Sequence, residues 1–397
     1  MVAKKYPMSK AELIQIESKD QFEDNLQLYC CLFDVEFSGI VSKSLADHPL
    51  SRSKCHGIVN AFEDNGRIVR ADLLYTTLTE QDFYILRDFY EWDSMRVFNF
   101  RRFQKGYLPT PFVKAILKLY EEKTTLKGIA GKEVEYLLSK GMLNACFGMA
   151  VTDIVRPEII YNGDWTTEAA DLAEQIEKYN KAFRRFLFYP WGVWVTAHAR
   201  RALFTGISEF NTDYIYSDTD SIKVINADKH KDYFTRYNRN IITELEFACN
   251  VHGIDPAAIR PKTIKGIEKP LGVWDDEGQY NAFKTLGAKR YLTLKNGELS
   301  LTVSGLNKKI VVPYLKAQYG DFAAIFDAFN DGLYIPKGQT GKNIHSYLDY
   351  KMQGIVTDYT GKAGEYNELS GVHLEAADYS LSIGKNYIEY LKGLRYE

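Results

Sequence analysis

One stretch of the sequence decides how the rest is interpreted: Tyr214-Ile215-Tyr216-Ser217-Asp218-Thr219-Asp220-Ser221-Ile222-Lys223-Val224. Apolar residues on both sides of a polar turn predict two strands joined near Asp218 and Asp220. If the backbone is extended there, both carboxylates point to one side. Two carboxylates this close repel each other, so a divalent cation is their natural partner, and Mg²⁺ is usually held by one or two carboxylates plus phosphate oxygens. Asp, Ser and Thr are also common turn residues, so a plain surface turn is the alternative.

The same eleven residues resemble motif C of the family B DNA polymerases, Tyr-x-Asp-Thr-Asp-Ser. The resemblance implies that Asp220 is the principal metal ligand and that Asp218 is an auxiliary acid near the same ions. It also implies that Tyr216 and Thr219 lie beside the primer DNA. The cofactor would be two Mg²⁺ ions, with Mn²⁺ as a substitute, and the nucleophile would be the primer 3′-hydroxyl.

A second segment, residues 140–148, reads Lys-Gly-Met-Leu-Asn-Ala-Cys-Phe-Gly. Lys140, Asn144 and Phe147 fall on one helical face at i, i+4 and i+7. The segment resembles the family's motif B, Lys-x-x-x-Asn-Ser-x-Tyr-Gly, with Phe147 in place of the usual Tyr, which removes a hydroxyl contact. The resemblance implies that Lys140 binds the incoming triphosphate, that Phe147 lies against the nascent base pair, and that Asn144 and Gly148 support them. A solvated lysine on an amphipathic helix is the alternative.

Two shorter segments resemble further parts of the same family. Lys123 begins a Lys-Thr-Thr segment that, in protein-primed members, also reaches the triphosphate. Lys289-Arg290-Tyr291 resembles the Lys-x-Tyr motif, in which Lys and Tyr face the primer terminus; on a strand, positions 289 and 291 share a face. Residues 281–316 carry seven basic side chains and one acidic one, and Lys308 and Lys309 would extend this track along the duplex. A solvated strand face is the alternative.

The order and spacing of these segments resemble the protein-primed branch of family B, which bacteriophages and linear plasmids use. The implied fold is α+β, a right-hand polymerase fold of palm, fingers and thumb. We divide the chain as follows: 1–105 palm strands and an insertion, 106–150 fingers, 151–187 a second insertion, 188–291 palm with motifs C and Lys-x-Tyr, and 292–397 thumb.

The secondary structure is predicted from periodicity and turn signals. Strands are expected at 29–40 and 68–74, hairpins at 158–165 (turn at Asn162-Gly163) and 214–224, and further strands at 291–313. Helices are expected at 79–90, 112–122, 131–149, 169–188 and 375–394, and residues 4–9 are read as a loop.

The family's first carboxylate motif, motif A (Asp-x-x-Ser-Leu-Tyr-Pro), is missing from the sequence. Asp34 is the only contender, but no Tyr-Pro follows it. The exonuclease domain of the family is also not recognisable. A segment like 5–9 follows shortly after motif A in relatives, so the hypothesis is a split polymerase whose separate N-terminal chain supplies the exonuclease and the motif A Asp. Primer-template DNA, deoxynucleotides and a terminal protein would be the other partners.

Composition sets wider limits. The chain has 397 residues, 26% of them charged, and a formal net charge of −2, so DNA binding must rest on local basic grooves. The five cysteines show no metal-ligand spacing and suit reduced thiols in a cytoplasmic protein. No signal peptide and no apolar run of membrane length is evident, so no membrane partner is expected. Two other functions stay open: a catalytically silent DNA-binding subunit, and an unrelated Mg²⁺ nuclease using Asp218 and Asp220.

Overall fold

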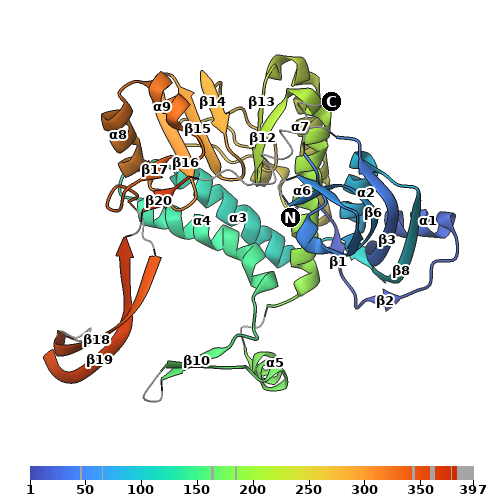
Figure 1. Ribbon diagram of the computed structural model, residues 1–397. Helices are drawn as coiled ribbons and strands as arrows, with labels where there is room; N and C mark the ends of the chain where they lie inside the picture. Colours follow the sequence, from blue (N-terminus) through green and yellow to red (C-terminus); the bar gives the residue numbers. More distant parts are fainter. Residues whose placement is uncertain are drawn as a thin grey trace. The chain divides into compact units, whose positions relative to one another are not determined.

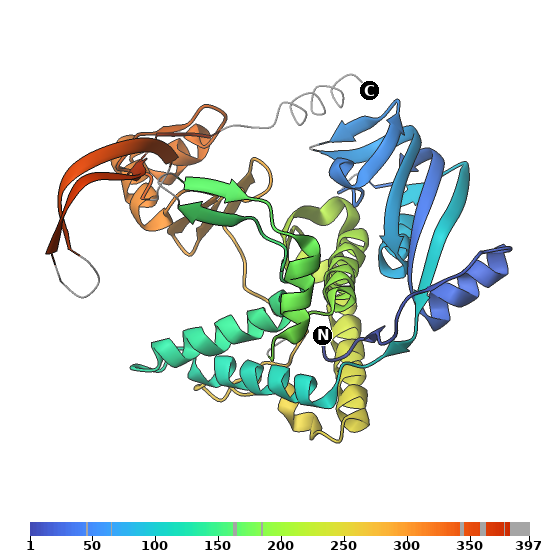
Figure 2. The same cartoon turned by 90° about the horizontal axis from the view of Figure 1, so that it is seen from below.

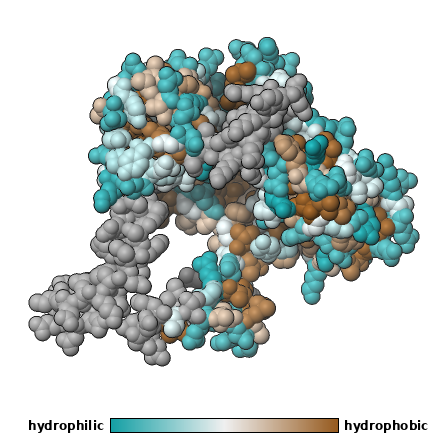
Figure 3. Space-filling view, in the orientation of Figure 1, coloured by the Kyte–Doolittle hydropathy of each residue, from teal (hydrophilic) through white to brown (hydrophobic). Residues whose placement is uncertain are grey.

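The computed structural model describes residues 1–44, 47–64, 66–161, 165–183, 186–341, 345–357, 363–376 and 378–381 (Figure 1). The chain forms two compact units, Met1–Asp275 and Asp276–Glu397, and each is described by itself. Among the described residues, no helix has the length and hydrophobicity needed to cross a membrane. Hydrophilic side chains cover much of the face seen in Figure 3, with smaller hydrophobic areas between them.

Unit 1 begins with an antiparallel sheet in the order β2-β8-β3-β6-β4, to which β5 adds on β6 and β7 on β3. On the long central strand β3, Phe33, Val35 and Phe37 are buried and alternate with half-buried Asp34 and Glu36, because successive side chains point to opposite faces. Helices α1 and α2 lie beside this sheet (Figure 1). The bounds are β2 Glu12–Leu13, α1 Lys19–Leu28, β3 Cys30–Ser42, β4 Cys55–Val59, β5 Phe62–Asp64, β6 Arg67–Thr79, α2 Glu80–Phe89, β7 Tyr90–Glu91 and β8 Ser94–Phe103.

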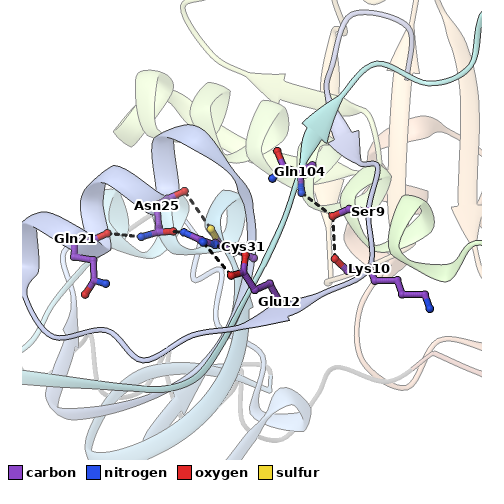
Figure 4. A network of polar contacts seen from close by, with 8 residues as sticks. Ser9, Lys10, Glu12, Gln21, Asn25, Cys31 and Gln104 are labelled. Carbon is purple, nitrogen blue, oxygen red and sulfur yellow. Dashed lines mark hydrogen bonds and ion pairs between the residues drawn. The ribbon is translucent and has the colours of Figure 1, made fainter.

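Polar contacts fix the edge of this sheet (Figure 4). The Arg102 guanidinium donates to both oxygens of Glu12, at 2.8 and 3.1 Å, and so ties the short strand β2 to β8. Arg102 also donates to the Asn25 side chain (3.2 Å), and the Cys31 thiol donates to the Asn25 carbonyl (3.2 Å). These contacts join α1 to the strands on which it packs.

The rest of unit 1 is mostly helical, and Figure 2 shows the long helices lying against one another. They enclose a second core that includes Trp194, Leu245 and Cys249. The bounds are β1 Tyr6–Pro7, β9 Lys105–Gly106, α3 Thr110–Leu126, α4 Glu133–Gly148, α6 Tyr189–Phe210, β12 Tyr214–Asp218, β13 Ser221–Val224 and α7 Lys231–Val251. Between α4 and α6, β10 (Glu158–Tyr161) pairs with β11 (Trp165–Glu168), and α5 (Leu172–Lys181) follows.

Glu80 joins the two cores of unit 1. Its side chain is fully buried, and both carboxylate oxygens accept from the Trp194 indole N–H at 2.9 and 3.0 Å. The Cys31 backbone N–H donates to the same carboxylate at 2.8 Å. Burial raises the pKa of Glu80, while these hydrogen bonds act in the opposite direction. Helix α6 is therefore anchored to α2 and β3 through one buried carboxyl group.

Unit 2 contains a three-stranded sheet, β14-β15-β16, packed against α8 and α9 around a core that includes Leu292, Val311 and Phe329. The strands β18 and β19 pair as a long antiparallel hairpin, and β17 pairs with β20. The bounds are β14 Ala282–Thr285, β15 Arg290–Lys295, β16 Glu298–Val303, α8 Lys308–Tyr319, α9 Phe322–Ala328, β17 Tyr334–Ile335, β18 His345–Thr357, β19 Ala363–Ala376 and β20 Tyr379–Ser380.

The predicted mixture of helices and strands is confirmed, and most elements lie where the pattern places them. Four of these predictions were wrong in whole or in part. The strands expected over 291–313 end at Val303, because residues from Lys308 onward form α8. Residues 4–9 are not all loop, because Tyr6–Pro7 pairs with Lys105–Gly106. The helix predicted over 169–188 is only ten residues long. Within the helix predicted over 375–394, the described residues Glu375–Ala376 and Tyr379–Ser380 form strands instead. Most of the rest of that segment lies outside the described residues, and so does the predicted turn at Asn162-Gly163.

Candidate active site

The two carboxylates of the motif C-like segment lie at the tip of the hairpin β12–β13, called here the carboxylate hairpin. Asp218 is the last residue of β12 and pairs with Ser221. Asp218 is half-buried, whereas Asp220 is exposed in the turn. The hairpin therefore presents two acidic side chains two residues apart, one of them fully accessible to an ion or a ligand.

The backbone between the two carboxylates is not extended, so the simple argument that placed both on one side of a strand was wrong. Thr219 has a φ of +58°, in the left-handed region, and the Asp220 N–H donates to the Asp218 carbonyl at 2.7 Å. The Thr219 hydroxyl donates to Asp218 Oδ1 at 2.9 Å. A tight turn, rather than strand alternation, brings the two acidic residues to one end of the hairpin.

The interior of the carboxylate hairpin is aromatic and well packed. Tyr216 is buried, and the hydroxyl groups of Tyr214 and Ser217 lie 3.0 Å apart. Burial raises the pKa of Tyr214 to about 12. Helix α6 packs against β13, and Gly206 allows the close approach: a Cβ at position 206 would lie 2.8 Å from Ile222 Cδ1. The predicted contact of Tyr216 with DNA stays a prediction, since only 8% of this residue is exposed.

The motif B-like residues lie on α4 as predicted. Lys140 and Asn144 are exposed one turn apart, and Phe147 is half-buried at the C-terminal end of the helix, beside Gly148. A Cβ at Gly192 of α6 would lie 3.7 Å from the Phe147 ring, so the two helices touch there. α4 therefore presents a cation and an amide to solvent and ends on an aromatic ring that α6 supports.

Lys123 lies on the neighbouring helix α3, half-buried, with its ammonium 5.6 Å from the centre of the Tyr120 ring. This cation–π contact holds the lysine stem near the helix surface. Its predicted contact with a triphosphate stays a prediction.

The Lys-x-Tyr-like residues belong to unit 2, and one expectation about them was wrong. Lys289 is not on a strand with Tyr291: its φ is +54°, and it lies in the turn that joins β14 to β15. The Ser304 N–H donates to the Lys289 carbonyl at 3.1 Å and holds this turn against β16. Tyr291 itself stacks on Phe283, with ring centres 5.4 Å apart. Lys289 is exposed at the turn, while Arg290 and Tyr291 are half-buried on β15.

Two lysines of the predicted basic track in unit 2 make internal contacts instead. Lys284 Nζ donates to the Phe326 carbonyl at 2.6 Å, and burial lowers its pKa. Lys295 Nζ donates to the Glu277 carbonyl. Lys308 and Lys309 are exposed in the first turn of α8, after the N-cap Asn307. The track is therefore shorter than the count of charges implied.

Asp34, the contender for the missing first carboxylate, is held within the sheet. Its Oδ1 accepts from the Thr77 hydroxyl at 2.6 Å and its Oδ2 from the Asn99 amide at 2.7 Å. Among the described residues, no three His, Cys, Asp or Glu side chains gather in a way that could hold a metal ion. A pair of carboxylates is a donor set that Mg²⁺ accepts together with phosphate oxygens, and the role of Asp218 and Asp220 as its ligands stays a prediction. A two-ion site needs at least one further carboxylate on the other side of the ions.

Comparison with known proteins assigns the fold. No protein-family model and no curated protein matches the sequence. The chain is similar to solved structures of Phi29 DNA polymerase: in its orthorhombic crystal form (16% identity, TM-score 0.54) and in a binary complex with primer-template DNA (16%, 0.56). A ternary complex of that enzyme with primer-template DNA and incoming nucleotides is similar too (15%, 0.54).

The fold is therefore that of a DNA polymerase. The structures that show this similarity are of Phi29 DNA polymerase, which is itself a protein-primed enzyme of family B. The likeness covers 95–96% of this chain and 55–56% of the Phi29 enzyme, so the chain spans just over half of that length.

Proposed function

We propose that this chain carries the synthetic site of a DNA-directed DNA polymerase of the protein-primed family B type. The observation that carries the proposal is the conjunction of a polymerase fold over almost the whole chain with two acidic residues at the tip of the carboxylate hairpin. The fold alone admits many functions, but an exposed Asp220 beside Asp218 supplies two of the carboxylates that metal-assisted phosphoryl transfer requires.

Each candidate residue has a defined task in this proposal. Asp220 is the principal ligand of Mg²⁺ or Mn²⁺, and Asp218 is an auxiliary acid; the ions, when bound, supply activation of the 3′-hydroxyl and neutralisation of the triphosphate. Lys140 on α4 pairs with phosphate oxygens, as a compact ammonium does well. Phe147 offers a flat apolar surface to the nascent base pair.

The remaining candidates bind nucleic acid or nucleotide in this proposal. Asn144 and Gly148 support the nucleotide face of α4, and Lys123 reaches the triphosphate from α3. Thr219 lies beside the primer at the hairpin turn. Five residues of unit 2 contact DNA: Lys289, Arg290, Tyr291, Lys308 and Lys309. Positive side chains on phosphates give binding that weakens with added salt.

The first carboxylate of the two-ion site comes, in this proposal, from a separate N-terminal chain that also carries the exonuclease. Support comes from Asp34, whose two oxygens are already engaged by Thr77 and Asn99. A terminal protein that offers a hydroxyl group for the first nucleotide is the further partner, as in protein priming.

The test begins with this chain tagged and purified from its native host together with whatever accompanies it. The purified assembly should extend a primer with Mg²⁺, and the Asp220→Asn variant should lose synthesis while its affinity for primer-template DNA stays within about twofold. Equal loss of DNA binding would assign Asp220 a structural role. Full primer extension by this chain without a partner would refute the split site.

A catalytically silent DNA-binding subunit is the second candidate. The observation that favours it is that, among the described residues, no third carboxylate joins Asp218 and Asp220, whereas a two-ion site needs at least one more. In that case the assembly binds primer-template DNA, and the Asp220→Asn variant matches the wild type in every assay.

A further inference from the structure

We propose that Asp213, Asn226 and His230 form a clamp that holds the base of the carboxylate hairpin and thereby positions Asp218 and Asp220. The proposal rests on the function proposed above and names three residues that act through the two aspartates. The three are called the hairpin clamp below. None of them belongs to the segments that identified the site.

The clamp closes the hairpin from the end opposite its acidic tip. Asp213 directly precedes β12, and Asn226 follows β13. Asp213 Oδ1 accepts from the Asn226 amide at 2.9 Å, and Asp213 Oδ2 lies 2.9 Å from His230 Nε2. The Asp213 carbonyl also accepts from the Ile225 N–H at 2.9 Å. One residue therefore ties together the segments that enter and leave the hairpin.

The clamp is sheltered from solvent. The side chains of His230 and Asp213 are only 14% and 17% exposed. The edge of the His230 ring meets Phe210, with ring centres 5.0 Å apart, and Asn226 adopts the left-handed conformation (φ +53°) that brings its amide to Asp213. Asn tolerates this conformation better than most residues, which explains its presence at this turn.

Charge favours the ionised acceptor that the clamp needs. The hydrogen bonds from Asn226 and then His230 lower the pKa of Asp213, and nearby Lys229 acts in the same direction. Asp213 is therefore a carboxylate at neutral pH, with each oxygen engaged by a different donor. Replacing it removes two contacts and the only acidic group of the clamp.

What holds the base of the hairpin matters because its strand pairing stops at two described strands. Among the described strands, β12 pairs only with β13, and the pairing is irregular between Tyr214 and Tyr216. An isolated two-stranded hairpin is marginally stable in water, so its position depends on what holds its base and its packed face. The packed face rests on α6 near Gly206. In this proposal the clamp holds the base of the hairpin and so fixes the direction in which the tip points.

The consequence is a specific kinetic signature. Asp218 at the tip lies five residues from Asp213, roughly 15–17 Å along an extended strand, and Asp220 follows in the same turn, so a small tilt at the base moves both aspartates together. Metal affinity and turnover should suffer, while DNA affinity should not. A loss of general stability would instead lower all three in parallel.

The experiment measures Mn²⁺ binding by electron paramagnetic resonance on the purified full chain, and primer extension by its native assembly. Asp213→Ala should raise the Mn²⁺ dissociation constant and the half-maximal Mg²⁺ concentration at least fivefold and leave primer-template affinity within twofold. Asp213→Asn, which keeps one acceptor oxygen, should recover part of the loss. His230→Ala should act in the same direction, and the double variant Asp213→Ala/His230→Ala should be no worse than Asp213→Ala, since contacting residues are not additive.

Asp228→Ala is the matched control, because this acidic residue lies in the same loop and makes only an exposed ion pair with Lys231. It should leave metal binding unchanged. Additive losses in the double variant, or an unchanged Mn²⁺ affinity in Asp213→Ala, would overturn the clamp. The Mn²⁺ measurement needs no catalysis, so the two proposals fail separately. An assembly that does not extend a primer refutes the proposed function, whereas the change in Mn²⁺ affinity decides on the clamp.

Discussion

Gly192 lies where a side chain would push the C-terminal end of α4, which carries Phe147. A Cβ at this position would be 2.0 Å from Val151 Cγ1 and 3.7 Å from the Phe147 ring. Ordinary carbon contacts are about 3.5–4.0 Å, so Gly192→Ala requires a displacement of roughly 1.5 Å at Val151. Val151 follows Phe147 by four residues in the same run of helical turns, and the displacement should therefore reach the Phe147 ring.

Two opposing free energies set the expected stability. Overpacking costs about 1–3 kcal/mol, and Ala in place of Gly within a helix contributes about 1 kcal/mol in the favourable direction. The net loss of unfolding free energy for Gly192→Ala should thus be small, about 0–2 kcal/mol. If displacement of the Phe147 ring weakens nucleotide binding by about one or two kcal/mol, KM for the incoming nucleotide should increase roughly 5–30-fold.

The assay is steady-state primer extension by the native assembly, with KM for the nucleotide and kcat resolved separately, beside thermal unfolding. Val151→Ala added to Gly192→Ala removes the colliding methyl groups and should restore KM. Gly141→Ala on α4 is the control, because a Cβ at position 141 would have no neighbour within 4 Å and only the propensity gain should appear. A higher unfolding temperature with unchanged KM in Gly192→Ala would refute the argument.

Three further outcomes are expected. Glu80→Ala should destabilise unit 1 by about 3 kcal/mol in urea unfolding, because it leaves the buried indole N–H of Trp194 and a buried backbone N–H without their acceptor. Burial lowers the pKa of His48 from 6.5 to about 4, so the unfolded chain takes up the proton first as the pH falls. The free energy of unfolding should therefore fall by up to about 3 kcal/mol between pH 6.5 and pH 4, and Asp47, whose pKa is raised by burial, should offset part of this loss. His48→Gln should flatten this dependence on pH. Lys140→Ala should raise KM for the nucleotide about tenfold, the value of one charge-assisted contact, and leave the unfolding temperature unchanged, because Lys140 is exposed.

The sequence was informative wherever a local pattern determines the outcome. Alternation over β3, the capped start of α2 at Thr79 and the helical spacing of Lys140 and Asn144 are each decided within a few residues, and each was predicted correctly. The hairpin that carries Asp218 was found for the same reason.

Local patterns failed where backbone conformation or a distant partner decides. Thr219 and Lys289 adopt left-handed conformations that neither residue type favours, so assuming an extended backbone misplaced both. Lys284 and Lys295 look like solvent-facing cations in the sequence, yet each donates to a carbonyl group inside unit 2. The partners of Asp213, which are Asn226 and His230, lie thirteen and seventeen residues away, separations at which the sequence carries no visible signal.

Helix α6 packs against both of the segments that were recognised separately in the sequence. Near its start, Gly192 admits Val151 and Phe147 at the end of α4; near its end, Gly206 admits Ile222 of the carboxylate hairpin. The two glycines are fourteen residues apart, about 21 Å of helix, and the Trp194 indole bonded to Glu80 fixes the helix between them. A helix anchored in this way holds the Phe147 ring and the acidic tip of the carboxylate hairpin in a constant relation. Changes at either glycine should therefore act on nucleotide or metal binding before they unfold the chain.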